Sequence, residues 1–221
     1  VTGVQTCALP IFTVPGILDD EKQILISAPP LKAKNYDFTR LISAIDYPVV
    51  VMNDARAEAY ADHWFNGKPE DEKIYIMLGE GVGGAYINAS AIRNGVHNRG
   101  GEFGHMVIHP GGKQCLCGKK GCLEAYVSEK VLSSELNMTL DNFFELAAQG
   151  NKNNSNVLDE YMDNLALGIN NIYTMMDCDI VLGGTVAPYL KQYDNSIKER
   201  LVNDYSFDTD ADYLRISDGG G

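Results

Sequence analysis

Long hydrophobic runs are missing from this sequence, and so is an excess of basic residues. No apolar run reaches the length of about 20 residues that a membrane-spanning helix needs. Lysine and arginine number 18 against 30 aspartates and glutamates, which gives a net charge of −12. This negative balance argues against direct binding of the segment to nucleic acid or to an anionic membrane. We therefore expect a soluble, cytoplasmic protein with no membrane partner.

Internal repeats and low-complexity tracts are also missing, and the chain does not begin with methionine. With 221 residues, 45% of them hydrophobic and 22% charged, the chain is long enough to bury a full globular core. Residues 1–12 share no evident pattern with the rest of the chain. We expect them to be a foreign or disordered leader that gives Cys7 no role, with an authentic edge strand as the alternative. Residues 13–221 are then expected to form one domain that is truncated at both ends.

Segments with strand and helix patterns alternate along the chain. A continuous apolar run at residues 47–52 predicts a buried strand, and apolar residues spaced by three and four predict a long helix at 155–176. Residues 14–19 are expected to form a turn. The other expected strands are 24–27, 73–78, 85–88 and 179–182, and the other expected helices are 37–45, 55–64, 139–149 and 189–201. Such alternation is typical of an α/β fold.

Three of the five cysteines fall within eight residues, in a segment rich in glycine. Cys115, Cys117 and Cys122 follow His105, and these four side chains match the ligands of a closed tetrahedral Zn²⁺ site. The intervening glycines let the backbone turn tightly enough for the four to converge. A structural zinc ion is favoured over a catalytic one, because four protein ligands leave no position open for water.

Alternatives remain open for these residues. The cysteines could pair as disulfides, although their short separations and the lack of a signal peptide argue against that. They could also remain free thiols. His109 competes with His105 as the fourth ligand, and the geometry of the loop favours His105.

Asp54 stands at the carboxyl end of the expected strand 47–52, where the next helix begins. Open α/β sheets bind ligands at this edge. A carboxylate there can accept a proton from a hydroxyl group, and the neighbouring Asn53 offers both a donor and an acceptor to a polyol. The competing interpretation makes Asp54 the N-cap of the helix, and the two roles are compatible.

Two glycine-rich turns come directly after expected strands. Their backbone N–H groups could cradle a phosphate, but hairpins and ordinary turns use the same residues, so the signal is weak. Glu80 weakens it further, because a carboxylate in the first turn would repel a polyphosphate. The candidate cofactor contacts are Gly79, Gly81, Gly83, Gly183 and Gly184.

Taken together, these motifs resemble the ROK family (repressors, open reading frames, kinases) of the sugar kinase, actin and Hsp70 superfamily. In chain order they are Val14-Pro15-Gly16, Met52-Asn53-Asp54-Ala55, residues 79–84, and Gly101-Glu102-Phe103-Gly104-His105 with the three cysteines. The resemblance covers about residues 13–216, and its last motif is the specific one. It implies an α/β, actin-like ATPase (ribonuclease H-like) fold of the sugar kinase type, mostly its C-terminal lobe, with a zinc-stapled loop.

The resemblance also implies roles for individual residues. The expected sugar contacts are Asn53, Asp54, Glu102, His105 and Glu124. Asp54 corresponds to the catalytic base of the family's kinases. His105, which the resemblance also favours over His109, would serve zinc through one ring nitrogen and the sugar through the other. A hexose or an N-acetylhexosamine is the expected ligand, and a homo-oligomer is the expected assembly.

The sequence departs from the family's kinases where they hold ATP. Their first phosphate loop, Asp-x-Gly-Gly-Thr, is absent, as are the lobe that carries it and the C-terminal helix. Glu80 replaces a threonine of the second phosphate motif. These departures favour the sugar-binding effector domain of a transcriptional repressor, and residues 164–188 resemble the branch of the N-acetylglucosamine and xylose repressors. Such a protein would bind DNA only through an N-terminal helix-turn-helix outside this sequence.

A sugar 6-kinase is the alternative. In that case Asp54 would deprotonate the sugar hydroxyl, and the missing lobe would complete the sites for ATP and Mg²⁺. A third interpretation is a fragment that folds but binds nothing well.

Overall fold

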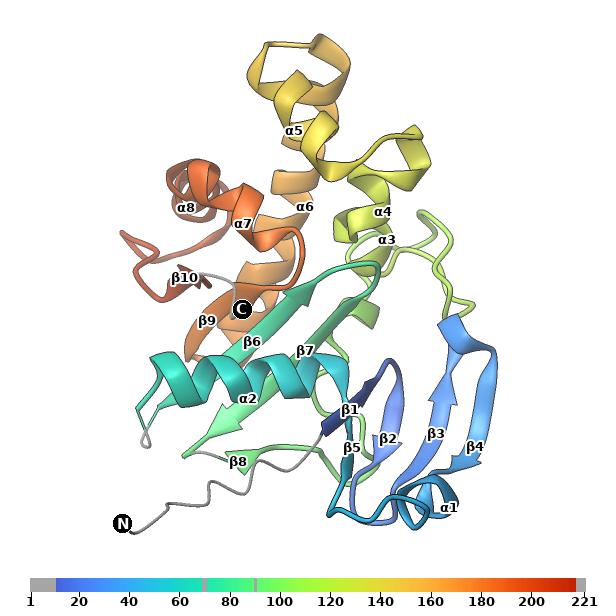
Figure 1. Ribbon diagram of the computed structural model, residues 1–221. Coiled ribbons are helices and arrows are strands. Elements are labelled where there is room, and N and C mark those ends of the chain that lie inside the picture. The colour runs from blue at the N-terminus through green and yellow to red at the C-terminus, as the bar shows by residue number, and fades with distance from the viewer. Residues whose placement is uncertain (1–10, 69–70, 90, 218–221) are drawn as a thin grey trace, which may run out of the picture.

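The computed structural model describes residues 11–68, 71–89 and 91–217, and its ribbon is shown in Figure 1. The described strands are β1 (Ile11–Val14), β2 (Ile17–Asp19), β3 (Ile24–Ala28), β4 (Ala33–Asp37), β5 (Val50–Asn53), β6 (Glu72–Leu78), β7 (Val82–Asn88), β8 (Ala91–Ile92), β9 (Asp179–Gly183) and β10 (Leu214–Ile216). The described α-helices are α1 (Thr39–Ile42), α2 (Asp54–Asn66), α3 (Glu124–Val127), α4 (Glu129–Leu132), α5 (Leu140–Ala148), α6 (Lys152–Met176), α7 (Ala187–Leu190) and α8 (Asp194–Arg200). The expected α/β class is confirmed.

A five-stranded sheet in the order β10-β9-β6-β7-β8 forms the centre of the molecule. Strand β6 runs antiparallel to β7 and parallel to β9, so the chain leaves β6 and β9 at the same edge of the sheet. A two-stranded sheet of β1 and β5 and a three-stranded sheet of β2, β3 and β4 lie to one side (Figure 1). Because the chain leaves β6 and β9 at the same edge of the central sheet, the two glycine-rich turns that follow these strands lie next to each other.

Helices cover both faces of the central sheet, as Figure 1 shows for α2 and α6. Side chains alternate along β6 because successive residues of a strand point to opposite faces. Ile74 and Ile76 belong to the main core with α6, whereas Tyr75 packs in a smaller core with Ala59 of α2. Burial of each large aliphatic side chain contributes about 1.5–3 kcal/mol, so the two faces together fix the sheet between its helices.

Helix α6 is the long helix that apolar spacing predicted, and it begins three residues earlier than expected, at Lys152. The side chain of Asn151 caps it by accepting hydrogen bonds from two backbone N–H groups. It ends at Met176, and its C-cap, Asp177, adopts a left-handed conformation with φ 48°. The large apolar side chains of its buried face are Leu158, Tyr161, Met162, Leu165, Ile169 and Ile172.

Helix α2 begins where the sequence predicted a functional carboxylate. Asn53 is its N-cap, since its side chain accepts the N–H of Arg56 at 3.0 Å, and Asp54 is the first helical residue. The interpretation of Asp54 as the N-cap is therefore wrong. Asp54 instead accepts the N–H of Ala55 at 2.8 Å, which suits a negative charge in the first turn.

Several short elements differ from the sequence-based expectations. Residues 17–19 form strand β2 rather than part of a turn, and the expected helix at 189–201 is divided between α7, a 3₁₀ turn and α8. Strand β1 begins at Ile11, inside the stretch expected to be a leader, and pairs in parallel with β5. Residues 1–10, Cys7 included, lie outside the described residues. None of the described helices is long and apolar enough to cross a membrane.

The close approach of α2 to β7 generates a test of the fold. Replacing Gly83 with alanine should destabilise the protein by about 1–3 kcal/mol, because the added carbon would lie 2.7 Å from the side-chain carbon of Ala55. Gly79→Ala is the control, since its added carbon would meet nothing closer than 3.8 Å. Urea titration followed by circular dichroism measures both free energies of unfolding. Equal values for the two variants would contradict this packing.

Candidate functional site

The ligand atoms of His105, Cys115, Cys117 and Cys122 all lie within 4.8 Å of one another. The sulfurs of Cys117 and Cys122 are 3.7 Å apart, and the sulfur of Cys115 is 3.7 Å from Nδ1 of His105. The edges of a tetrahedral zinc site measure about 3.6–3.8 Å, given metal bonds of about 2.3 Å to sulfur and about 2.0 Å to nitrogen. The four residues can therefore hold a metal ion.

A tight turn presents the three thiols. The N–H of Cys115 bonds to the carbonyl of Lys119, the N–H of Gly118 bonds to the carbonyl of Cys115, and Gly118 has φ +90°. Only glycine adopts such a φ without steric cost. Cys115 and Cys122 are buried, and this burial raises the pKa of both thiols. A bound cation would reverse the shift, because a coordinating thiol is deprotonated.

His109, the competing fourth ligand, is not among the four residues whose ligand atoms converge. Its Nε2 lies 2.6 Å from Oδ1 of Asn164 on α6, and its ring packs edge-on against Tyr126 with centroids 4.8 Å apart. His105 thus lies in the cluster, whereas His109 connects the loop to α6.

Glu102 lies beside the other ring nitrogen of His105. Its Oε2 is 3.7 Å from Nε2, and about one third of each side chain is exposed, 32% for Glu102 and 34% for His105. Burial raises the pKa of the Glu102 carboxyl, while the charges of His105 and Arg56 oppose that shift. One nitrogen of His105 is therefore directed to the metal site and the other to an accessible carboxylate.

Glu124 connects the metal cluster to the first glycine turn. Its Oε1 is 3.5 Å from the sulfur of Cys115, and its Oε2 accepts the N–H of Val82 at 3.1 Å. Val82 begins β7 directly after the turn at residues 79–81. The single carboxylate of Glu124 thus contacts both a candidate metal ligand, Cys115, and the residue that follows the glycine-rich turn, Val82.

Asn53 and Asp54 stand at the start of α2, which packs against β7 just after the same turn. The side-chain amide of Asn53 donates to the carbonyl of Gly16 at 3.0 Å and to Asp54 at 3.1 Å. The next residue, Ala55, packs against Gly83, which follows Val82. Burial raises the pKa of the Asp54 carboxyl, as suits a group that accepts a proton. Two small hollows of about 150 and 240 Å³ lie outside this constellation.

The glycines predicted to contact a cofactor all have packing neighbours in this chain. An added side-chain carbon would lie 1.7 Å from the hydroxyl of Tyr75 at Gly183 and 2.5 Å from the carbonyl of Leu78 at Gly184, where φ is +82°. At Gly81 it would lie 3.1 Å from Glu124. The close approach of β6 and β9 therefore explains the glycines of the second turn without any ligand.

Two glutamates at these turns were not identified from the sequence. Glu129 accepts the hydroxyl of Thr185 at 2.5 Å and donates its N–H to the carbonyl of Gly79 at 2.7 Å. Glu58 accepts the hydroxyl of Tyr75 at 3.2 Å, and desolvation together with the nearby charge of Asp54 raises its pKa. No local pattern could have indicated Glu129, because Thr185 is 56 residues away in sequence.

The sequence matches the family model described as "ROK family" over residues 4–216. The xylose repressor of Bacillus subtilis is 30% identical over 176 residues, covering 76% of this chain and 46% of the relative. The xylose repressor of Caldicellulosiruptor bescii is 26% identical, covering 88% and 54%. The N-acetylmannosamine kinase of Yersinia pestis is 29% identical, covering 68% and 53%. The chain thus spans about half the length of the curated relatives it matches.

Solved structures of regulators and kinases share the fold. A ROK family transcriptional regulator, a homologue of the E. coli MLC protein, has a TM-score of 0.79 at 23% identity, covering 95% of this chain and 57% of that structure. The ROK hexokinase of Thermus thermophilus has a TM-score of 0.74 at 24% identity, covering 92% and 71%. A ROK glucokinase of Streptomyces griseus, solved with glucose and AMPPNP, has a TM-score of 0.71 at 25% identity, covering 85% and 66%.

The convergence of four ligands predicts about one metal ion per chain. Cys117→Ser should lose the ion and destabilise the loop, because three ligands no longer close the tetrahedron. Cys178→Ser is the matched control, since Cys178 is a free thiol outside the cluster. Elemental analysis of purified protein measures the ratio. A folded chain prepared without chelators that carries no metal would contradict the assignment.

Proposed function

This chain belongs to the ROK family, and on that premise we propose that it forms the sugar-binding part of a carbohydrate-responsive transcriptional repressor. Sugar binding would shift the populations of conformers and thereby change affinity for DNA. The DNA-binding helix-turn-helix, a homo-oligomeric assembly and a cytoplasmic location belong to this proposal as well.

The proposed sugar contacts are the polar groups around His105. Glu102 and Glu124 accept hydrogen bonds from sugar hydroxyls, and Asn53 and Asp54 offer further polar atoms from the start of α2. We assign the metal as Zn²⁺, because three thiolates and one imidazole are the ligands of a closed structural zinc site. Nδ1 of His105 would bind the ion, because it is the nitrogen that lies near the sulfur of Cys115, and Nε2 would remain available to Glu102 or the sugar. The ligand is a hexose, a pentose such as the xylose named for the relatives, or an N-acetylhexosamine.

The carboxylates at the glycine-rich turns are the observation that favours a repressor over a kinase. Glu129 binds both turns, Glu58 approaches the second turn, and Glu80 stands exposed in the first. A carboxylate and a phosphate oxygen about 4 Å apart repel each other by about 4 kcal/mol at an effective dielectric constant of 20. Phosphoryl transfer needs the reverse, backbone donors and Mg²⁺ around the phosphates. The arrangement supports a sugar site that has no nucleotide beside it.

A sugar kinase is the second candidate, and Asp54 favours it. A carboxyl group whose pKa is raised by burial, at the carboxyl end of a strand, is suited to deprotonate a sugar hydroxyl. In that case ATP and Mg²⁺ would bind with residues outside this sequence. The similarity to an N-acetylmannosamine kinase is consistent with this alternative.

Sugar binding provides the direct test of the proposal. Glu102→Ala should weaken binding by about tenfold or more, because a lost hydrogen bond to a charged group costs about 1.5–3 kcal/mol. The fold should survive, since the Glu102 side chain is 32% exposed. Titration calorimetry with xylose, glucose, N-acetylglucosamine and N-acetylmannosamine measures affinity. Glu135→Ala, at an exposed glutamate outside the candidate site, is the control. Failure of every sugar to bind the unaltered chain would refute the proposal.

The chain should not phosphorylate any of these sugars. Asp54 can act as a base, but a base contributes nothing unless a phosphate is held in line with the attacking hydroxyl. A coupled assay with ATP and Mg²⁺ measures turnover, with Asp54→Asn as the reference. Turnover above background that disappears in Asp54→Asn would make the kinase the better assignment.

A further inference from the structure

We propose that Arg56 is a positioning residue that fixes Glu102 relative to Asn53 and Asp54, so that the two groups of sugar contacts form one site. For its ligand this inference rests on the proposed sugar-binding function. The contacts of the guanidinium group by themselves support the other part of the inference. That part is a rigid connection between helix α2, the turn at residues 19–23 and the loop at residues 93–101.

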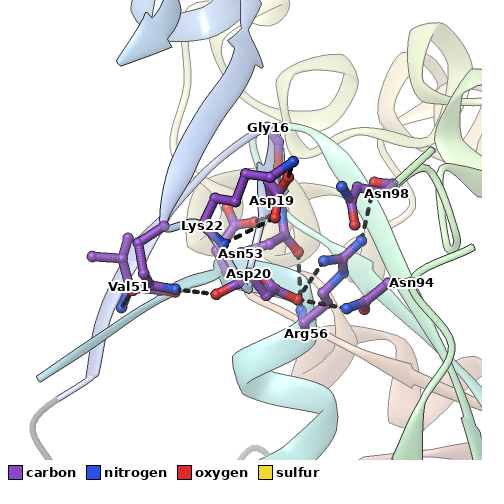
Figure 2. A network of polar contacts seen from close by, with 11 residues as sticks. Gly16, Asp19, Asp20, Lys22, Val51, Asn53, Arg56, Asn94 and Asn98 are labelled. Carbon is purple, nitrogen blue, oxygen red and sulfur yellow. Dashed lines mark hydrogen bonds and ion pairs between the residues drawn. The ribbon is translucent and has the colours of Figure 1, made fainter. Parts of the chain in front are cut away.

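Arg56 lies in the first turn of α2, two residues after Asp54, and only 4% of it is exposed. Figure 2 shows its guanidinium group between Asp20 and Asn98. Nη1 donates to Oδ2 of Asp20 at 2.9 Å, and Nη2 donates to the backbone carbonyl of Asn98 at 3.1 Å. The side chain of Asn94 donates to the same Asp20 oxygen at 2.8 Å. One buried cation thus joins three segments that are distant in sequence.

The loop at residues 93–101 leads directly into Glu102 and has little apolar side chain to bury. Its one large aliphatic side chain, Val96, is 95% exposed. At its end, Gly101 packs so closely on β7 that an added carbon would lie 2.1 Å from the carbonyl of Gly84. At its start, the contacts of Asn94 and Asn98 with Asp20 and Arg56 take the place of a hydrophobic anchor. The segment is also anchored by the N–H of Arg93, which donates to the carbonyl of Tyr86 at 2.9 Å, and by Phe103, which packs against the main core. The polar network adds the connection from this loop to Asp20 and α2.

The turn at residues 19–23 is attached to strand β5 by hydrogen bonds. The side chain of Gln23 accepts the N–H of Val51 at 2.7 Å and donates to its carbonyl at 3.2 Å, as a paired strand would. It also donates to the carbonyl of Asp20 at 2.7 Å. Val51 belongs to β5, which ends at Asn53. Asp20 is thereby tied to the strand that delivers Asn53 and Asp54.

Only arginine fits this position. Its planar guanidinium group directs two N–H groups at two different acceptors, whereas lysine presents a compact point charge that cannot serve both with the same geometry. Asp20 depends on the pair as well, because its other carboxylate oxygen, Oδ1, is buried and has no hydrogen-bond partner within the described residues. Arg56→Lys keeps the positive charge but removes the planar pair of N–H donors, so this variant tests the contribution of the geometry alone.

The experiment compares Arg56→Lys with Asp20→Asn and a control in the same turn. Lys22→Met is the control, since Lys22 pairs with Asp19 at 3.1 Å but is 71% exposed and does not contact Arg56. Hydrogen–deuterium exchange followed by mass spectrometry reports backbone protection, and calorimetry with the four sugars reports affinity. Thermal unfolding checks that each variant is folded. If Arg56→Lys fails to fold, Asp20→Asn provides the same two measurements.

We expect Arg56→Lys to speed exchange about tenfold in residues 20–23 and 94–101 together, and to weaken sugar binding about tenfold. Asp20→Asn should act in the same direction, and the double variant should bind no more weakly than Arg56→Lys, because both remove one network. Lys22→Met should change neither measurement. A merely structural role would lower the unfolding temperature without this paired change.

Unchanged exchange in residues 94–101 of folded Arg56→Lys would overturn the inference, and so would unchanged sugar affinity. Weakened binding without faster exchange in that loop would also overturn it, because Arg56 would then act through something other than position. If the unaltered chain binds none of the sugars, the proposed function fails. The exchange measurement still decides whether Arg56 connects the three segments.

Discussion

The convergence of four metal-ligand atoms is the constraint on which the candidate site depends. From residue 110 to residue 121 the chain has one large aliphatic side chain, Leu116, and it is 63% exposed. A segment without a hydrophobic core of its own needs another source of order. A metal ion shared by His105 and the three cysteines would supply it, in the manner of small metal-stapled domains. Such an ion would also fix His105, and Glu124 contacts the cluster through the sulfur of Cys115.

The central sheet brings this loop to the remaining polar groups. Glu124 reaches from the loop to Val82 at the start of β7, and β7 packs against α2 at Gly83 and Ala55. Asp54 directly precedes Ala55 at the start of α2. Strand β7 thus connects two parts of the candidate site that are far apart in sequence, and Arg56 would connect them as well in the proposed arrangement.

The glycine turns illustrate how one sequence signal can have two physical causes. Gly183 and Gly184 pack against Tyr75 and Leu78 because β6 and β9 are neighbours in the sheet. Such glycines are required by the packing of the fold whether or not a nucleotide binds. The acidic side chains around them are more informative, because their charge decides which ligands the turns tolerate. For that reason the proposed choice between repressor and kinase rests on Glu129 and Glu58 and not on the glycines.

Features that depend on local geometry could be predicted from the sequence alone. The α/β alternation, the long helix α6 and the grouping of three cysteines follow from side-chain periodicity and short spacing, which the backbone translates directly into structure. The choice between His105 and His109 required the folded chain, because His105 converges with the cysteines whereas His109 contacts Asn164 on α6. The tertiary structure alone revealed that Arg56 meets Asp20 and Asn98, 36 and 42 residues away. Such pairs arise from the order of strands in the sheets, and no local pattern records that order.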